Sequence, residues 1–398
     1  MARHYEVPPT AGLPPSISDL FTSGGDLADM ASRVMGLTSP QVECSGTASL
    51  VIALETLKKS STRSEVIIPA YTCPLVPIAI AHCGLQVKLC DLAPDDFDLD
   101  MKQLASLVTE NTLAVLPTHL GGRVANIGEV KKLAAPFEVT VIEDAAQALG
   151  ADVGKHGDIT FYSLAVGKGL STFEGGLMTA NNGELRQGLL KTSQNIIPSD
   201  MPFELRRCIE LIGYSFFYNP KGLHYVYGQT RRKALQAKQP EEAIGDVFDF
   251  DIPLHRVSRW RMKVGANAMK RLPEFIEQTG RQALKRCDRL DAISGIRVIR
   301  DKSDARGVWP FLMVLMPDRT SRDAALKRLW PSPLGVTRLF MHALPDYNYL
   351  GKIVPATRAP NARDFANRML TISNSLWLDD ERFGKICQTL ELAVSQNK

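Results

Sequence analysis

The sequence lacks the cysteine patterns that mark disulfide-stabilised secreted domains and zinc sites. Its seven cysteines are scattered, without a CxxC pair and without histidines at ligand spacing: Cys44, Cys73, Cys83, Cys90, Cys208, Cys287 and Cys387. An odd number of scattered cysteines predicts reduced thiols. We therefore expect a protein of a reducing compartment that has no metal site.

Long apolar segments are also missing. No stretch approaches the roughly 18 consecutive apolar residues that a membrane-spanning helix needs. Residues 1–15 are polar and contain prolines, unlike the apolar core of a signal peptide. The sequence therefore predicts a cytoplasmic protein.

The chain has no large excess of charge of either sign. It contains 47 basic and 43 acidic residues, for a formal net charge of +4. Because nucleic-acid-binding proteins concentrate basic residues on one face, we expect no nucleic acid partner. Hydrophobic residues make up 44% and charged residues 23% of the 398 residues, which is typical of a globular chain of two or three domains.

Short apolar runs alternate with helical patterns through the first half of the chain. We expect four strands there, at 66–68, 87–90, 113–116 and 139–142. We also expect two helices, at 48–59 and 100–108. This alternation favours a mainly parallel sheet with helices on both faces. Ligands of such sheets bind at the carboxyl ends of the strands, so the residues after each run are candidates for a site.

The composition changes in the middle of the chain. Seven aromatic residues lie between Phe203 and Tyr227, with basic residues among them. We interpret this part of the chain as an aromatic insertion at about 200–245.

The last third of the chain predicts a smaller domain. Ser258 to Leu290 predicts a helix that Pro273 interrupts, and residues 296–299 and 309–315 predict strands. The predicted organisation is a large α/β domain over residues 1–255 and a smaller α+β domain over residues 256–398.

Two segments at strand ends have the residues of a phosphate site and of a buried acid. Residues 44–49 open a predicted helix, whose free N–H groups and dipole favour a phosphate, although Ser45 or Thr47 as a plain N-cap is the alternative. Glu143 and Asp144 end an apolar strand, where a buried carboxylate requires a cationic partner. The alternative for Asp144 is an N-cap of the next helix.

A third segment contains a lysine in an unusual setting. Lys168 lies between two glycines within an apolar stretch, and a tight turn at 173–176 follows it. Desolvation lowers the pKa of a lysine and makes it a nucleophile towards carbonyl groups. A lysine in a solvated surface loop is the alternative.

Together these segments resemble the DegT/DnrJ/EryC1/StrS family of pyridoxal-phosphate enzymes, which are mostly sugar aminotransferases of the fold type I (aspartate aminotransferase-like) class. The resemblance runs from about Val42 to Ala180 and rests on motifs in family order: Ser-Gly-Thr-Ala at 45–48, Pro-Ala-Tyr-Thr at 69–72, Thr-His-Leu-Gly-Gly at 118–122, Glu-Asp-Ala-Ala-Gln-Ala at 143–148, Gly-Asp at 157–158, and Ser163 through Lys168 to Glu174-Gly175-Gly176. It implies a fold type I transferase with a mainly parallel seven-stranded sheet, a smaller C-terminal domain, and a homodimer with active sites at the interface.

The resemblance also implies roles for single residues. Lys168 would hold pyridoxal 5'-phosphate (PLP) as an imine and move protons, and Asp144 would keep the pyridine nitrogen protonated. The other expected cofactor contacts are Thr47, Ala48 and Ser163 at the phosphate, Gln147 at the phenolic oxygen, and Tyr71. The expected substrate contacts are His119, Glu174, Arg261 and His342.

The sequence departs from the family pattern at three places. Ala165 stands where the family usually has a histidine, and Cys73 stands where an aromatic residue often covers the ring, with Tyr71 as a possible substitute. Arg259-Trp260-Arg261 replaces an Asn-x-Arg that in many members reaches across the dimer to the phosphate.

The implied reaction is transfer of an amino group, from glutamate as donor, to a keto group of a nucleotide-linked sugar or related metabolite. The alternatives are a PLP-dependent lyase or decarboxylase, and a non-catalytic cofactor-binding regulatory protein. Lys168 argues against the dehydratase branch of the family, in which a histidine replaces this lysine.

The aromatic insertion has two interpretations. We favour packing of these aromatic side chains onto the body of the protein or onto a dimer partner, since a large exposed apolar patch promotes aggregation of a soluble protein. Peripheral membrane contact through residues 203–227 is the alternative, because Leu205, Ile209, Ile212 and Phe216 form an apolar stripe at helical spacing.

Overall fold

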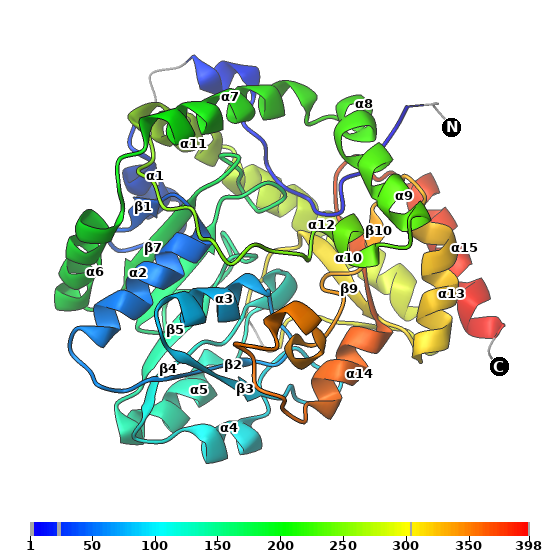
Figure 1. Cartoon of the computed structure of the whole chain (residues 1–398). Coiled ribbons are helices and arrows are strands. Elements are labelled where there is room, and N and C mark those ends of the chain that lie inside the picture. The colour runs from blue at the N-terminus through cyan, green and yellow to red at the C-terminus, as the bar shows by residue number, and fades with distance from the viewer. Residues whose placement is uncertain (1–3, 22–24, 303–304, 397–398) are drawn as a thin grey trace.

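A seven-stranded sheet forms the centre of the larger part of the molecule (Figure 1). The computed structural model describes residues 4–21, 25–302 and 305–396. The strands, in spatial order, are β1 (Gln41–Glu43), β7 (Gly176–Ala180), β6 (Ile159–Ser163), β5 (Thr140–Asp144), β4 (Thr112–Val115), β2 (Glu65–Pro69) and β3 (Gln86–Cys90). The strands from β6 to β3 are parallel, and β7 pairs antiparallel with both β6 and β1.

Helices cover both faces of this sheet because successive side chains of a strand point to opposite faces. Phe161 of β6 and Met178 of β7 belong to the apolar core beneath α2 and α3, whereas Tyr162 and Leu177 pack with α1 and α11. The helices around the first sheet are α1 (Leu27–Met35), α2 (Gly46–Lys58), α3 (Leu75–His82), α4 (Met101–Leu107), α5 (Ile127–Ala134), α6 (Gly183–Ile196) and α11 (Arg259–Met269), with short 3₁₀ turns η1 (Ile17–Leu20), η2 (Leu120–Gly122) and η3 (Ala135–Phe137).

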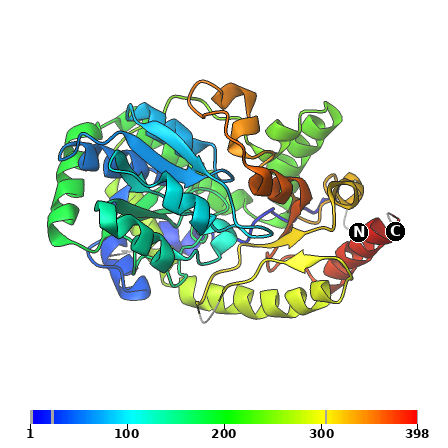
Figure 2. The ribbon, with the colours of Figure 1, turned by 90° about the horizontal axis from the view of Figure 1, so that it is seen from below.

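A second, four-stranded antiparallel sheet has its own apolar core. Its strands, in spatial order, are β10 (Val336–Thr337), β11 (Met369–Ser373), β9 (Phe311–Leu315) and β8 (Arg297–Val298). The helices of this part are α12 (Leu272–Asp291), α13 (Arg319–Leu329), α14 (Pro360–Arg368) and α15 (Asp380–Ser395), with 3₁₀ turns η5 (Leu344–Asp346) and η6 (Asn348–Leu350). Figure 2 shows α12, in yellow-green, running from the half that contains the first sheet to the half that contains the second.

The aromatic insertion is helical. It comprises α7 (Met201–Phe217), α8 (Pro220–Leu223), a π-helical turn η4 (His224–Gly228), α9 (Gln229–Gln236) and α10 (Pro240–Ile244). Asp200 caps α7 by accepting a hydrogen bond from the N–H of Phe203 at 2.9 Å. Within the ranges that the structure describes, none of the helices combines the length and the apolar character needed to cross a bilayer.

The predicted fold class is confirmed by the mainly parallel seven-stranded sheet and the smaller α+β part. The four predicted strands of the first half match β2, β3, β4 and β5, and the predicted helix over Ser258–Leu290 is interrupted between α11 and α12. Pro273 lies in the first turn of α12, where the missing N–H of proline is tolerated. The predicted domain boundary at residue 255 falls between α10 and α11 and stays a prediction.

A contact between η2 and the segment before β9 joins the two parts of the molecule. The guanidinium of Arg123 is 3.4 Å from the ring centre of Trp309 and forms an ion pair of 2.6 Å with Asp301. The N–H of Val308 donates to the carbonyl oxygen of Gly122 at 3.0 Å. Gly122 has a φ of +75°, and a Cβ atom at this position would overlap the carbonyl oxygen of Val308.

We expect Gly122→Ala to lower the free energy of unfolding by about 3 kcal/mol, because it combines an unfavourable φ with a backbone clash. Urea unfolding measures the loss. Gly36→Ala is the matched control, since Gly36 has a φ of +69° and a Cβ atom there would meet no other atom within 4 Å. It should cost only about 1 kcal/mol, and an equal loss in both variants would show that the contact with Val308 is unimportant.

Candidate active site

The carboxyl ends of neighbouring parallel strands bring the predicted site residues to one edge of the first sheet. Cys73 follows β2, Thr118 follows β4, Asp144 ends β5 and Ser163 ends β6. Backbone hydrogen bonds hold these ends together, since the N–H of His119 donates to the carbonyl oxygen of Asp144 at 2.9 Å. This is the edge at which ligands of parallel sheets bind.

Lys168 lies half-buried in the loop between β6 and β7. Burial lowers the pKa of Lys168, while the nearby Cys73 and Asp144 oppose that shift. An N-terminal segment holds the loop in place: the N–H of Leu13 donates to the carbonyl oxygen of Gly169 at 3.1 Å, and the N–H of Ser171 donates to the carbonyl oxygen of Leu13 at 3.1 Å. The lysine is therefore not in a solvated surface loop, which was the alternative for this residue.

Asp144 is 4% exposed at the end of β5. Burial raises the pKa of Asp144, and the N–H of Ala146, which donates to Oδ1 at 3.0 Å, and the charge of Lys168 oppose that shift. The structure thus combines an amine with a lowered pKa and an acid with a raised pKa at one strand edge. Opposite shifts of this kind at one site are typical of acid–base chemistry.

His119 and Glu143 form a buried pair beneath Asp144. The N–H of Ala125 donates to Nδ1 of His119 at 3.0 Å, so Nε2 carries the proton and donates to Glu143 at 3.0 Å. Glu143 also accepts from the N–H groups of Gly154 at 2.8 Å and Gly157 at 2.5 Å. Burial acts to raise the pKa of Glu143, but the hydrogen bonds from His119, Gly154 and Gly157 outweigh it and lower that pKa.

This arrangement leaves His119 without a free ring nitrogen. Its ring is fully buried and both nitrogens have protein partners, so His119 positions Glu143 and the end of β5. The predicted contact between His119 and a substrate stays untested, and the geometry favours a positioning role.

The N-terminus of α2 and Ser163 form a cradle. Ser45 is the N-cap of α2, because its Oγ accepts from the N–H of Ala48 at 2.9 Å. The N–H of Ala48 is therefore already engaged, whereas those of Gly46 and Thr47 lie in the first turn, where helix geometry supplies no partner. A Cβ atom on Gly46 would lie 3.2 Å from Cβ of Ser163, so the glycine leaves open the space beside the Ser163 hydroxyl.

Gln147 and Cys73 are two further side chains at the carboxyl edge of the first sheet. Oε1 of Gln147 accepts from the N–H of Gly121 at 2.7 Å, which orients the side-chain amide and leaves Nε2 as a donor. Burial raises the pKa of Cys73 to about 12, and the charges of Lys168, Asp246 and Asp144 also act on this thiol. Cys73 therefore lies beside the lysine and the carboxylate.

Tyr71 lies in the core. Its ring packs edge-on against Phe340 and Phe365, and its hydroxyl exchanges hydrogen bonds of 3.2 Å with the backbone of Phe340. The side chain is 1% exposed. Because packing and hydrogen bonds hold Tyr71 against the segment after β10, nothing in this geometry favours it as a substitute for the missing aromatic cover at Cys73.

Arg261 and Glu174 are held by the insertion. Arg261 is fully buried, and Glu204 of α7 accepts from its Nε at 2.8 Å and from its Nη2 at 2.6 Å. Nη1 of Arg261 donates to the carbonyl oxygen of Glu174 at 2.5 Å, and the Glu174 side chain pairs with Arg207. Both residues therefore connect α7 to the turn after Lys168, and their predicted contact with a substrate stays a prediction.

His342 lies apart from these residues, after β10. Its Nε2 is 3.1 Å from Oε1 of Glu241 in α10, and its ring packs edge-on against Tyr347. It borders a pocket of about 260 Å³ that is also lined by four arginines: Arg319, Arg322, Arg338 and Arg363. Burial and the neighbouring Arg322 lower the pKa of Arg338 to about 10.

Sequence patterns did not indicate Asp246 as a site residue. It is 2% exposed, accepts from the N–H of Met341 at 2.7 Å and from the hydroxyl of Tyr347, and lies near Cys73 and His342. Burial raises the pKa of Asp246. It belongs to an acidic stretch, Asp246 to Asp251, and follows no predicted strand, so no local signal marked it.

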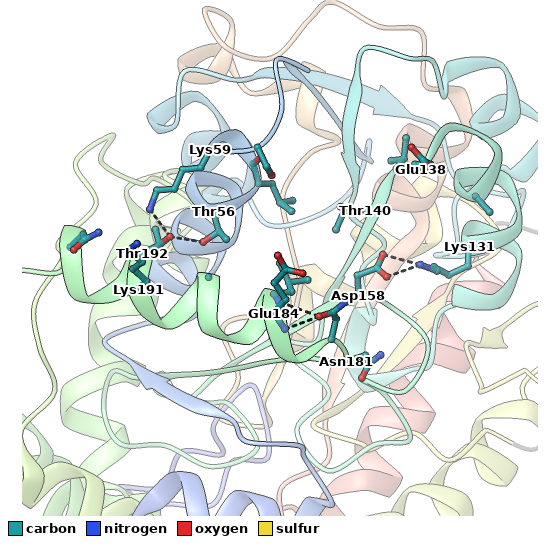
Figure 3. Close-up of a pocket in the computed structure, with 18 residues that line it drawn as sticks. Thr56, Lys59, Lys131, Glu138, Thr140, Asp158, Asn181, Glu184, Lys191 and Thr192 are labelled. Carbon is teal, nitrogen blue, oxygen red and sulfur yellow. Dashed lines mark hydrogen bonds and ion pairs between the residues drawn. The ribbon is translucent and has the colours of Figure 1, made fainter.

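A cleft of about 1060 Å³ lies at the opposite edge of the sheet (Figure 3). Thr140 at the start of β5 lines it, together with Asp158, which pairs with Lys131 at 2.7 Å, and Thr192, which accepts from Lys59 at 2.8 Å. Because ligands of parallel sheets bind at the carboxyl ends of the strands, we assign the chemistry to the edge that contains Lys168.

Residues 38–200 match the model of the DegT/DnrJ/EryC1/StrS aminotransferase family. The chain is 34% identical over 145 residues to GDP-perosamine synthase of Caulobacter vibrioides, which covers 35% of this chain and 39% of that protein. It is 25% identical over 360 residues to a UDP-4-amino-4-deoxy-L-arabinose–oxoglutarate aminotransferase of Shewanella sediminis, covering 86% of this chain and 83% of that protein. The chain spans only part of three other curated relatives that it matches, namely 53%, 35% and 64% of their lengths.

Solved structures show the same fold. The crystal structure of DesI in the presence of its TDP-sugar product superposes with a TM-score of 0.75, at 19% sequence identity, over 99% of this chain and 94% of DesI. This likeness confirms the predicted fold type.

We expect Glu143→Gln to lower the free energy of unfolding at pH 7 by about 3 kcal/mol, because an amide replaces one of its acceptor oxygens with a donor. The folded-state pKa of Glu143 is depressed, so its contribution is present above the unfolded pKa and is lost as the pH falls through the folded pKa. The difference between wild type and variant should therefore narrow below about pH 4. Urea unfolding at pH 7 and pH 3.5 measures this.

The control for this substitution is Glu129→Gln. Glu129 forms an exposed pair with Lys132, so its replacement should change the stability by less than about 1 kcal/mol at either pH. A Glu143→Gln loss that stays the same at both pH values would contradict the charged state assigned to Glu143.

Proposed function

We propose that the protein is a PLP-dependent aminotransferase of the DegT/DnrJ/EryC1/StrS family, because residues 38–200 match the model of that family. The proposed reaction moves an amino group from glutamate to a keto group of a nucleotide-linked sugar or related metabolite. The first half-reaction loads the cofactor with the amine, and the second delivers the amine to the acceptor.

The observation that carries this proposal is that Lys168 and Asp144 lie within electrostatic reach of each other at the carboxyl edge of the parallel sheet. The residues present fit the cofactor. An amine with a lowered pKa suits attachment to an aldehyde, and a buried carboxylate suits a protonated ring nitrogen. The space that Gly46 leaves beside Ser163 suits a phosphate at the N-terminus of α2.

Each residue of the edge has a task that its position supports. The hydroxyl of Ser163 and the first-turn N–H groups of Gly46 and Thr47 would hold the phosphate. Asp144 would keep the ring nitrogen protonated, and Nε2 of Gln147 would be a donor for the phenolic oxygen. When bound, PLP supplies an electron sink for the carbanion at the substrate carbon.

Lys168 is the proton carrier of this site. Its lowered pKa raises the fraction of neutral Nζ near neutral pH, and a neutral amine can accept a proton from the substrate carbon and return it. The loop that carries Lys168 is fixed by the backbone bonds of Leu13, so Nζ is presented from a constrained position.

The pocket beside His342 supports an anionic substrate. Arg322 and Arg338 are buried near each other, and Arg322 pairs with Asp323 at 2.7 Å. Arg338 donates to the carbonyl oxygens of Met341 and Ala366, so its buried charge would be stabilised by an anion in the pocket. Guanidinium groups bind phosphate and carboxylate well. This chemistry fits the diphosphate of a nucleotide-linked sugar, or the carboxylates of glutamate.

We further propose that the enzyme is a homodimer with its sites near the interface. Val166, two residues before Lys168, is 46% exposed. Exposed apolar side chains beside a site are the kind of surface that a second subunit covers.

Glutamate should convert the protein-bound cofactor to its amine form, because the first half-reaction needs no acceptor. The expected result is loss of the absorption of the lysine-bound cofactor, with release of 2-oxoglutarate. Lys168→Ala is the matched variant: borohydride should fix the cofactor covalently in the wild type and not in this variant.

The same experiment separates the alternatives. No spectral change with glutamate, together with normal borohydride fixation, would point to a lyase, a decarboxylase or a non-catalytic cofactor-binding protein. Covalent fixation in Lys168→Ala would show that another lysine holds the cofactor.

Asp144→Asn should still bind the cofactor but lose at least about a hundredfold in the rate of amine transfer, or about 3 kcal/mol of transition-state stabilisation. A neutral amide no longer holds the proton on the ring nitrogen, which weakens the electron sink. Single-turnover kinetics with glutamate measures the rate. Asp152→Asn, at an exposed aspartate that pairs with Lys155, is the control and should leave the rate unchanged.

A further inference from the structure

The outward face of α7 is apolar along its whole length. Met201, Leu205, Ile209, Ile212 and Phe216 are 75%, 63%, 62%, 39% and 50% exposed. Their spacing of three and four residues places them on one stripe of the helix, which we call the α7 apolar face. This differs from the interpretation that the stripe packs onto the body of the protein.

The orientation of α7 is fixed by its opposite face. Leu211 and Tyr214 are buried there, and Glu204 is held by the buried ion pair with Arg261 at 2.6 Å. Rotating the helix to cover the α7 apolar face would expose these apolar side chains and leave Arg261 buried without its carboxylate, at a high cost in free energy. The apolar face is therefore a stable feature of the surface.

Further exposed apolar side chains lie at the end of α7, in η4 and around η1. Phe217, Tyr225 and Val226 are 58%, 52% and 61% exposed, at the end of α7 and in the helical turn η4. Ile17 and Phe21, which are 49% and 82% exposed, belong to or follow η1, which contacts α7. Figure 1 shows α7 along the upper edge of the molecule, with the blue N-terminal turn beside it. A surface of this extent is typical of a docking site.

The segment that carries this surface is strongly basic. Residues 201–238 contain seven basic and two acidic residues, a net charge of +5 in a chain whose total is +4. Both acidic residues have cationic partners, Glu204 in Arg261 and Glu210 in Arg206 and Arg207. Arg231 and Arg232 pair with Glu6, which lies outside the segment, so the positive charge at the surface comes mainly from the lysines. Lys221, Lys233 and Lys238 are exposed.

We propose that this surface docks on an anionic lipid bilayer. The α7 apolar face enters the boundary between headgroups and acyl chains, and the neighbouring lysines and arginines contact the anionic headgroups. A helix of 17 residues, about 25 Å long, lies in the plane of the interface in this mode. The aromatic side chains Phe216 and Tyr225 suit the interfacial layer.

Charge favours a bilayer over a second copy of this chain. A twofold contact through this surface would place it against itself, so that the exposed Lys221, Lys233 and Lys238 of the two copies would approach each other. Like charges repel across such a contact, whereas an anionic bilayer attracts them. The docking surface is therefore distinct in kind from the apolar surface beside Lys168.

Co-sedimentation with vesicles tests the proposal. The wild type should sediment with vesicles of phosphatidylglycerol and phosphatidylcholine, and bind about tenfold less to phosphatidylcholine alone or at high salt. Leu205→Ser with Phe216→Ser should lose about tenfold or more of the binding to anionic vesicles. Leu392→Ser, at a leucine of α15 that is 49% exposed, is the matched control and should bind as the wild type does.

A second variant changes charge and keeps the apolar face. Lys221→Glu with Lys233→Glu replaces two exposed side chains, so the fold should survive, and binding to anionic vesicles should again fall about tenfold. Circular dichroism and light scattering should show unchanged folding and mass for both double variants.

Three results would overturn the proposal. The first is a wild type that ignores anionic vesicles. The second is a Leu205→Ser, Phe216→Ser variant that binds vesicles normally. The third is a change of molecular mass in that variant, which would make the α7 apolar face a contact between copies of the chain.

Discussion

The burial of the Asp144 carboxylate near the amine of Lys168 is the constraint on which the site depends. Removing a carboxylate from water is costly, and the protein offsets this cost with the N–H of Ala146 and the charge of the lysine. The preceding residue, Glu143, is equally buried, but successive side chains of a strand point to opposite faces. The two carboxylates therefore have separate partners, and Glu143 holds His119 and three backbone N–H groups while Asp144 stays available for chemistry.

Local sequence patterns predicted four strands of the first sheet, β2 to β5, whereas the seven-stranded sheet was implied by the resemblance to the family. The apolar runs of β2, β4 and β5 are almost entirely buried, so they stand out against polar turns, and Asp144 lies at the end of one of them. Contacts between residues far apart in the sequence produce no local sequence pattern and were not predicted. Leu13 binds the loop of Lys168 from more than 150 positions away, and Tyr71 is held by Phe340 across the two parts of the molecule.

The residues that were predicted to contact a substrate also have partners that local sequence patterns did not indicate. A motif places His119, Arg261 and His342 near a site, but their partners decide what they can do. His119 has two protein partners, and Arg261 is occupied by a glutamate of the insertion that the family motif does not include. Because Glu204 lies 57 positions from Arg261 in a segment of different composition, the sequence offered no reason to pair them.

The buried pair of Glu204 and Arg261 also has an evolutionary consequence. A chain that lost α7 would keep a guanidinium in the interior without its carboxylate, and a chain that lost Arg261 would leave the carboxylate of α7 in the same position. Neither intermediate is favourable, so the two residues should covary among descendants of this chain. The helix is therefore inherited as a unit with the turn that follows Lys168, since Arg261 also binds the backbone of Glu174 in that turn.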